Sequence, residues 1–390
     1  MAQQALVNPS LLAWARERAQ MSIDALSDKL QSKPERISAW ENGNQRPTFK
    51  QAQKLAKTLH VPFGYLFLSK PPQETLPIPD LRTIADRQNA SLSLEFRDLL
   101  NDIKRKQQWY REYALENDES AFEFFGIANI EQNIQDVAHS IRNALGLTSI
   151  ARGKCRTTEE YLKFLTEKIE AIGVLVMRNS IVGNNTHRAL NVHEFRGFAI
   201  GDRYAPLIFM NSSDANSAKI FTLIHELAHL WIAQSGISDI DLDKTTDNRT
   251  EKFCNAVSAE VLTPQDEFLR FWDFNAGMGE NCSKEASLFK VSTFVTARRA
   301  YDLGLVDAGT FYDYYRQESE NFEQIRQHRR DQQTGGGSYY ANVRVRNGSR
   351  FSSAVISSAL EGRIPYREAA ALLNINASKI AEFSKELGIR

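Results

Sequence analysis

The sequence of 390 residues lacks the features of a membrane or secreted protein. No apolar run approaches the roughly 20 residues that span a bilayer, and the first residues lack a charged and hydrophobic signal. The chain has three cysteines, Cys155, Cys254 and Cys282. Their number is odd, and no two of them have the close spacing of metal-binding cysteines, so we expect reduced thiols. The formal net charge is zero. This excludes a protein whose whole chain binds polyanions through an excess of positive charge. We therefore expect a cytoplasmic protein that makes no membrane contact.

Histidine is also scarce, yet two of the seven histidines stand close together in an apolar stretch. Residues 220–233 read IFTLIHELAHLWIA, with no Gly or Pro, which predicts a helix buried on most of its circumference. Four residues advance a helix by about 40° more than one turn, so His225 and His229 project from one face and can share one cation. The alternative is a chance pattern of two core histidines beside a solvated Glu226.

Glu226 follows the first histidine directly, where its carboxylate can reach a water on the metal without binding the metal itself. A third ligand is expected to be a carboxylate, because no histidine lies between residues 230 and 327. A second helix is predicted over residues 249–264, with Glu251 at its start and Glu260 near its end. Two histidines, a glutamate and a water form a catalytic rather than a structural zinc site, and both glutamates are candidates.

The two helices together resemble the ImmA/IrrE family of metallopeptidases. The second motif of that family runs roughly E-x-x-A-N-x-F-A-A-x-L-L-M-P, and residues 251–264 of this chain follow it as EKFCNAVSAEVLTP. The glutamate that opens the motif is a zinc ligand in the family. The resemblance therefore favours Glu251 over Glu260, and it implies one zinc ion per chain with Glu226 as general base. The departures, such as Cys254 for Ala, are packing changes.

The same resemblance has implications for the fold. It implies a gluzincin-like peptidase domain in which a strand, here Ala205–Asn211, precedes the zinc helix. In the family this strand lies at an edge of the sheet and can bind an extended peptide by backbone pairing.

Residues 1–69 carry nine basic and five acidic side chains, so their formal net charge is +4, whereas that of the whole chain is zero. Five short helices are predicted, over residues 11–20, 23–30, 34–41, 48–59 and 63–68. Ser22 is the expected N-cap of the second helix, and Ser32 with Glu35 is the expected capping box of the third. This succession is the helix-turn-helix plan. Its predicted core consists of Leu12, Ala15, Leu26, Leu30, Ile37, Trp40, Leu55, Ala56 and Leu59.

The segment Ile37–Gly43, ISAWENG, resembles the Xre (Cro/repressor-like) family, in which this run closes the recognition helix. Carried over by position, the resemblance implies base contacts by Lys33, Glu35, Arg36 and Ser38, and phosphate contacts by Ser22, Arg46 and Lys50. Such domains usually bind paired half-sites as dimers, which points to an inverted-repeat operator and a homodimer. The alternative for this small bundle is dimerisation without DNA binding.

The remaining segments predict an extended strap, a long helix, a small sheet and a helical tail. Residues 69–82 hold four prolines and should be extended, and residues 91–117 form an amphipathic helix with Lys104–Lys106 on a solvated face. Further helices are predicted over residues 134–145 and 159–172, and strands over residues 173–177, 195–200 and 205–211.

Beyond the glycines at 335–337, residues 339–345 are strand-like, and helices are predicted over residues 368–373 and 377–387. This last pair has helix-turn-helix rhythm. Its acidic residues and the lack of a basic cluster nevertheless favour a helical cap on the protease over a second DNA reader.

The sequence thus predicts a mainly α-helical chain with an α+β protease domain. Its parts are a helix-turn-helix domain (1–69), a strap with a long helix (70–132), a zinc metallopeptidase domain (133–333) and a C-terminal helical region (334–390). The favoured function is a transcriptional regulator or antitoxin-like protein whose zinc endopeptidase domain cleaves a protein partner, such as a co-encoded toxin or repressor. The alternative is a non-enzymatic repressor that uses the metallopeptidase fold for partner binding or sensing.

Overall fold

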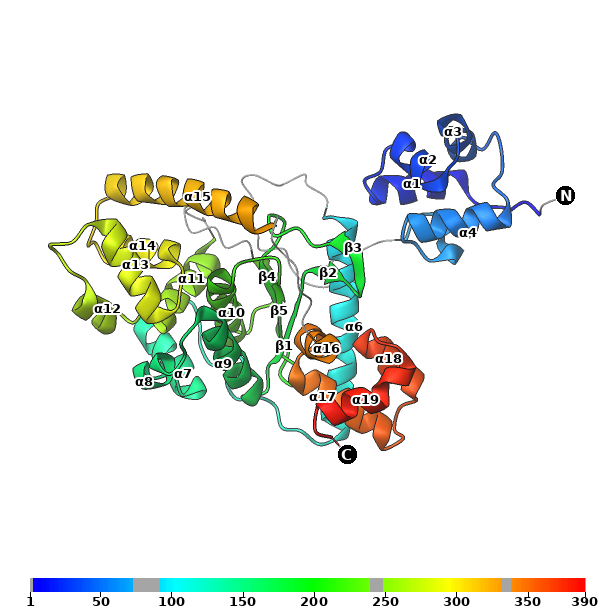
Figure 1. The fold of residues 1–390 in the computed structure, drawn as a ribbon. Helices are drawn as coiled ribbons and strands as arrows, with labels where there is room; N and C mark the ends of the chain where they lie inside the picture. The colour runs from blue at the N-terminus through cyan, green and yellow to red at the C-terminus, as the bar shows by residue number, and fades with distance from the viewer. Residues whose placement is uncertain (1–2, 73–91, 239–247, 331–337, 390) are drawn as a thin grey trace. The chain divides into compact units, whose positions relative to one another are not determined.

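The computed structural model describes residues 3–72, 92–238, 248–330 and 338–389 (Figure 1). The fold is mainly helical with two small sheets, as the sequence predicts. The chain divides into one unit of residues 1–77 and 89–101 and another of residues 78–88 and 102–390. Most of the predicted strap and the triple glycine lie outside the described residues.

The first unit contains the five predicted short helices: α1 (Pro9–Arg18), α2 (Ile23–Leu30), α3 (Pro34–Glu41), α4 (Phe49–Thr58) and the 3-10 helix η1 (Phe63–Phe67). All nine predicted core residues are buried in one cluster between these helices. Ser22 caps α2 by accepting the Ala25 N–H at 3.1 Å, as predicted. The capping box predicted for α3 is wrong. Lys33 is the N-cap and makes no side-chain cap bond, because Pro34 occupies the first helical position and begins the helix after Ser32.

The long helix α6 (Leu94–Glu116) runs from the first unit into the second. The second unit continues with α7 (Ile134–Leu145), α8 (Ser149–Gly153), α9 (Thr158–Ala171), β1 (Leu175–Asn179), β2 (Ile181–Val182), β3 (Asn185–Ala189), β4 (Gly197–Ile200), β5 (Leu207–Asn211), α10 (Asn216–Trp231), β6 (Gly236–Ser238) and α11 (Arg249–Leu262). It ends with α12 (Gln265–Phe271), α13 (Met278–Phe289), α14 (Thr293–Asp302), α15 (Ala308–Arg330), α16 (Tyr339–Asn347), α17 (Ser349–Leu360), α18 (Tyr366–Leu373), η2 (Ala377–Lys379) and α19 (Ile380–Glu386).

The larger sheet has the strand order β1-β5-β4-β6, with β1 parallel to β5 and with β4 antiparallel to both β5 and β6. The expectation of an edge strand at Ala205–Asn211 is therefore wrong. Strand β5 is paired on both sides, and all five of its residues are buried. A strand that is covered on both faces carries a continuous apolar run such as LIFM. Among the described strands, β1 and β6 form the edges.

The two faces of this sheet are covered differently. Ala199, Ile208 and Met210 share one hydrophobic cluster with the buried residues of α9 and α10, and Figure 1 shows these helices together on one side of the strands. The opposite face carries Phe198 and Phe209, whose rings stack with centroids 5.1 Å apart. The small residues of β4 therefore face α10, and its large aromatic residue faces away.

The segment expected as a strand at residues 339–345 is helix α16 instead. Val343 and Asn347, four residues apart, are both buried, which is the helical rather than the alternating pattern. Gly348 follows with a φ of +76°, and a Cβ atom there would lie 2.6 Å from Val176 O on β1. The turn between α16 and α17 thus lies directly against the backbone of β1, an edge strand of the larger sheet.

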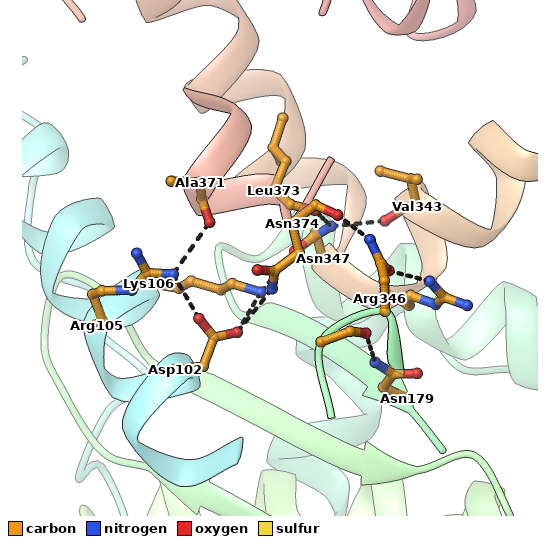
Figure 2. Close-up of polar contacts among 12 residues, drawn as sticks. Asp102, Arg105, Lys106, Asn179, Val343, Arg346, Asn347, Ala371, Leu373 and Asn374 are labelled. Carbon is orange, nitrogen blue, oxygen red and sulfur yellow. Dashed lines mark hydrogen bonds and ion pairs between the residues drawn. The ribbon is translucent and has the colours of Figure 1, made fainter. Parts of the chain in front are cut away.

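The basic run Lys104–Lys106 of α6 is expected from the sequence on a solvated face, and for Lys106 this expectation is wrong. Lys106 is buried, donates to Asn347 Oδ1 at 3.0 Å and pairs with Asp102 Oδ2 at 3.0 Å (Figure 2). Asn374 Nδ2 also donates to Asp102 Oδ2 at 3.0 Å. We call Asp102, Lys106, Asn347 and Asn374 the α6 clasp. Lys106 is buried because this face of α6 meets the C-terminal helices, which sequence spacing alone does not predict.

Candidate metal centre

Helix α10 brings the two histidines of the HExxH pattern together in the core. Every residue from Lys219 to Trp231 is buried, and the helix continues for 16 residues without Gly or Pro. His225 Nε2 and His229 Nε2 lie 3.1 Å apart. The two imidazoles therefore project from one face of α10, as the spacing of four residues predicts.

Glu251 completes the group from the first turn of α11. This helix begins after Asn248, whose side chain caps it by accepting the Thr250 N–H. Glu251 Oε2 lies 3.1 Å from His225 Nε2, and Oε1 lies 3.2 Å from His229 Nε2. A tetrahedral zinc ion with bonds of about 2.0–2.1 Å spaces its ligand atoms by about 3.4 Å. The three donor atoms therefore fit one such ion with little movement.

This is the only group of at least three His, Cys, Asp or Glu side chains with metal-ligand spacing among the described residues. The rival carboxylate, Glu260, lies near the other end of α11 and forms an ion pair with Arg299. It also accepts the Gln265 N–H at 3.1 Å. Cys254 is buried but does not belong to the donor group. The structure thus places Glu251, and not Glu260, beside the histidines.

The electrostatics of the group favour the protonation states that bind metals. Burial raises the pKa of Glu251, but hydrogen bonds from His225 and His229 outweigh this effect and hold the pKa below its usual range. Burial lowers the pKa of His229, and this outweighs the opposite influence of Glu251. An ionised carboxylate and a neutral imidazole are the forms that coordinate a divalent cation.

Glu226, the candidate general base, lies outside the donor group although it neighbours His225 in the chain. Its side chain is fully buried and rests against strand β4. A Cβ atom added at Gly197 would lie 3.1 Å from Glu226 Oε1. No sequence signal points to Gly197, because the close approach of β4 to α10 arises only in the folded sheet.

The residues expected to contact DNA lie at the surface of the first unit. Ser22, Lys33, Glu35, Arg36, Arg46 and Lys50 are exposed, and Ser38 is half-buried. On α3, Ile37 and Trp40 point into the core, so the opposite side of this short helix is left to solvent. The Ser22 hydroxyl already accepts the N–H of Ala25 as the cap of α2. No helix in the described parts of the chain has the length and apolarity needed to cross a bilayer.

The fold and the donor group define a protein with a helix-turn-helix unit and a metallopeptidase-type α+β domain. Comparison with protein families agrees: the family described as Helix-turn-helix matches residues 12–66, and the one described as IrrE N-terminal-like domain matches residues 169–301. A domain of unknown function matches residues 347–386. Comparison with curated proteins gives no match. The chain thus joins an Xre-like helix-turn-helix domain to an ImmA/IrrE-type peptidase domain, a combination that supports a regulator with a peptidase-family domain.

Proposed function

We propose that this protein is a DNA-binding regulator whose IrrE-like domain is a zinc-dependent endopeptidase acting on a protein partner. One observation carries the proposal. The Nε2 atoms of His225 and His229 lie 3.1 Å apart, and each lies 3.1–3.2 Å from one of the two carboxylate oxygens of Glu251. All three side chains are buried, and Glu226 is the residue next to His225. Two histidines and one glutamate leave a fourth position for water, which is the arrangement of catalytic zinc sites.

The chain's own residues have distinct roles in this proposal. His225, His229 and Glu251 hold one zinc ion, which when bound supplies Lewis-acid chemistry toward water and a peptide carbonyl. Glu226 accepts the proton of the attacking water and donates it to the leaving amine. The burial of all four side chains excludes bulk water, which strengthens the electrostatic interactions within the site.

The DNA-binding part of the proposal rests on the helix-turn-helix unit. Lys33, Glu35, Arg36 and Ser38 read base edges, while Ser22, Arg46 and Lys50 contact phosphates. The expected target is an inverted repeat bound by a homodimer. Because DNA offers a peptidase no peptide bond, the substrate is a protein, and a co-encoded toxin or repressor is the candidate we favour.

The second candidate is a non-enzymatic repressor that uses the metallopeptidase-type fold to bind a partner or to sense a signal. Such a protein needs the fold but not Glu226. The fully buried Glu226 beside His225 argues for the enzyme. Burial of an ionisable side chain carries a free-energy cost, and a protein that uses the fold for binding alone gives no reason to keep Glu226 in the core.

The test combines metal analysis with a cleavage assay. We expect about one zinc per chain and cleavage of a protein encoded beside the gene, as seen by mass spectrometry of the fragments. Glu226→Gln keeps the size of the side chain and should retain zinc while losing cleavage. Wild-type protein that binds the partner with full zinc and never cuts it would favour the non-enzymatic candidate.

A further inference from the structure

We infer that Gly197, on strand β4, is a positioning residue that sets where the Glu226 carboxylate lies relative to the donor group of His225, His229 and Glu251. This inference rests on the proposed function. It concerns a residue outside the donor group and outside every motif of the sequence.

Gly197 lies where β4 is crowded from two sides. Its backbone is opposite Met210 of β5 and Ser238 of β6. A Cβ atom added at this residue would point toward α10. A Cβ atom there would lie 2.6 Å from Thr222 Cγ2, 3.0 Å from Phe209 O and 3.1 Å from Glu226 Oε1. These distances are shorter than ordinary van der Waals contacts.

Space, and not backbone conformation, is the reason for glycine at this position. Gly173 and Gly348 have positive φ angles of 105° and 76°, where any side chain is strained. Gly197 is not among the glycines with positive φ, so an alanine could adopt its backbone. Gly197 is the first residue of β4 and is paired on both sides, and a glycine in a strand that needs no special φ is typical of a close approach by another group. Here the approaching groups are Thr222 and Glu226 of α10.

A methyl group at this position would move Glu226 because the other neighbours are held more firmly. Phe209 O belongs to the backbone of the adjacent strand. Thr222 is β-branched and stiff, and its Oγ1 donates to Ala218 O at 3.1 Å. The end of the Glu226 side chain is the most adaptable of the three. A Cβ atom at 3.1 Å displaces this carboxylate by a few tenths of an ångström. That shift takes up most of the roughly 0.5 Å within which a catalytic group must be held, so it should lower catalysis.

The experiment separates packing from positioning with three variants. Gly197→Ala should lower both the thermal midpoint and kcat, with zinc content and KM near the wild-type values. Thr222→Ser removes the methyl group at 2.6 Å and keeps the hydroxyl. The double variant G197A/T222S should therefore regain much of the thermal midpoint while kcat stays a few-fold to about 10-fold low, because a displacement of a few tenths of an ångström costs less than the roughly 100-fold of a 1 Å misplacement.

Gly201→Ala is the matched control, because it adds the same methyl group just beyond the end of β4. Its Cβ would meet side-chain atoms of Phe125 and Ser235 at 3.1 Å, and Glu226 is not among its three nearest neighbours. We expect a wild-type kcat for this variant. Recovery of kcat together with the thermal midpoint in G197A/T222S would overturn the inference, because Gly197 would then serve packing alone.

A spectroscopic measurement decides the inference without any cleavage assay. In cobalt(II)-loaded protein, the visible absorption of G197A/T222S should shift from that of wild type in the direction of Glu226→Gln, and Gly201→Ala should match wild type. An unchanged spectrum of the double variant overturns the inference even if wild type is an active peptidase. Wild-type protein that loads cobalt, shows the shift and cleaves nothing contradicts the proposed function but supports the positioning role. Wild-type protein that loads neither zinc nor cobalt overturns both.

Discussion

Glu251 and Glu260 lie on the same helix, α11, but they have different neighbours, and this difference predicts opposite effects on metal binding. Glu251→Ala removes one of three donors and should strongly lower zinc content. Glu260→Ala leaves the donors intact and should keep about one zinc per chain, although loss of its partner destabilises Arg299, with a cost of about 3 kcal/mol for a broken buried pair. Zinc content measured by atomic emission, with circular dichroism to confirm folding, distinguishes them. A folded Glu260→Ala protein without zinc would move the third ligand to Glu260.

A second carboxylate, Glu285 on α13, predicts a pH dependence of stability that is independent of the metal. Its side chain is fully buried, and burial raises its pKa to about 7. The unfolded value is about 4.3, so between these values the folded state binds the proton more tightly. Stability from this group therefore falls as pH rises from about 4.3 to about 7, and the loss persists above that.

Glu285→Gln removes this titration while keeping the size of the side chain. The thermal midpoint of the variant relative to wild type should be more favourable at pH 8 than at pH 5, as measured by differential scanning fluorimetry. The comparison of the two proteins cancels titrations that they share. An equal difference at both pH values would contradict the burial effect.

Local signals predicted individual elements well, and long-range packing accounts for the failures. Helix α7 has the predicted bounds because Asn133 caps its start and Gly146 ends it with a φ of 62°. The His225 and His229 pair follows from helical periodicity. Glu251 needed the family resemblance, since spacing alone left Glu260 open. The buried state of Lys106 depends on helices more than 200 residues away along the chain, which no local pattern can reveal.

The α6 clasp predicts how the C-terminal helices are held. Lys106→Met preserves length and leaves Arg105, at 2.6 Å, as the remaining cation beside Asp102, so the loss should be smaller than the roughly 3–5 kcal/mol of a fully broken buried pair. Hydrogen exchange should therefore accelerate in α16 to α18 more than in α10. Lys104→Met is the matched control, because Lys104 lies on the same helix and donates to the nearby Gln107 at 3.0 Å rather than to the C-terminal helices. The double variant K106M/D102N should recover part of the protection, and equal exchange in both single variants would argue against the clasp.

At the scale of the whole molecule, the helix-turn-helix unit predicts a division of labour in DNA binding. Arg36→Ala should cost roughly 1–3 kcal/mol and relax the base preference, whereas Lys50→Ala should weaken all sequences alike and reduce the salt dependence. Fluorescence anisotropy on an inverted repeat upstream of the gene, at several salt concentrations, measures both effects. Sequence-specific binding that survives removal of residues 1–69 would refute the assignment.

The union of a helix-turn-helix unit and a peptidase-family domain in one chain predicts how the two proposed activities are coupled. Cleavage of the chain's own strap at residues 69–82 would discard the reader after a single event, so a separate partner is the better substrate for a reusable regulator. Glu226→Gln should keep zinc, DNA binding and partner binding but lose cleavage.

In cells, a reporter under the protein's own operator separates the outcomes. Suppose that a signal relieves repression by the wild-type protein. If the Glu226→Gln protein represses normally but no longer responds to that signal, cleavage is the switch that relieves repression. If it represses, responds and neutralises its partner as wild type does, proteolysis is dispensable. Glu251→Ala supplies the comparison, since it should lose the metal as well as cleavage: a response lost in Glu251→Ala but kept in Glu226→Gln would show that the metal site senses a signal without cutting a peptide.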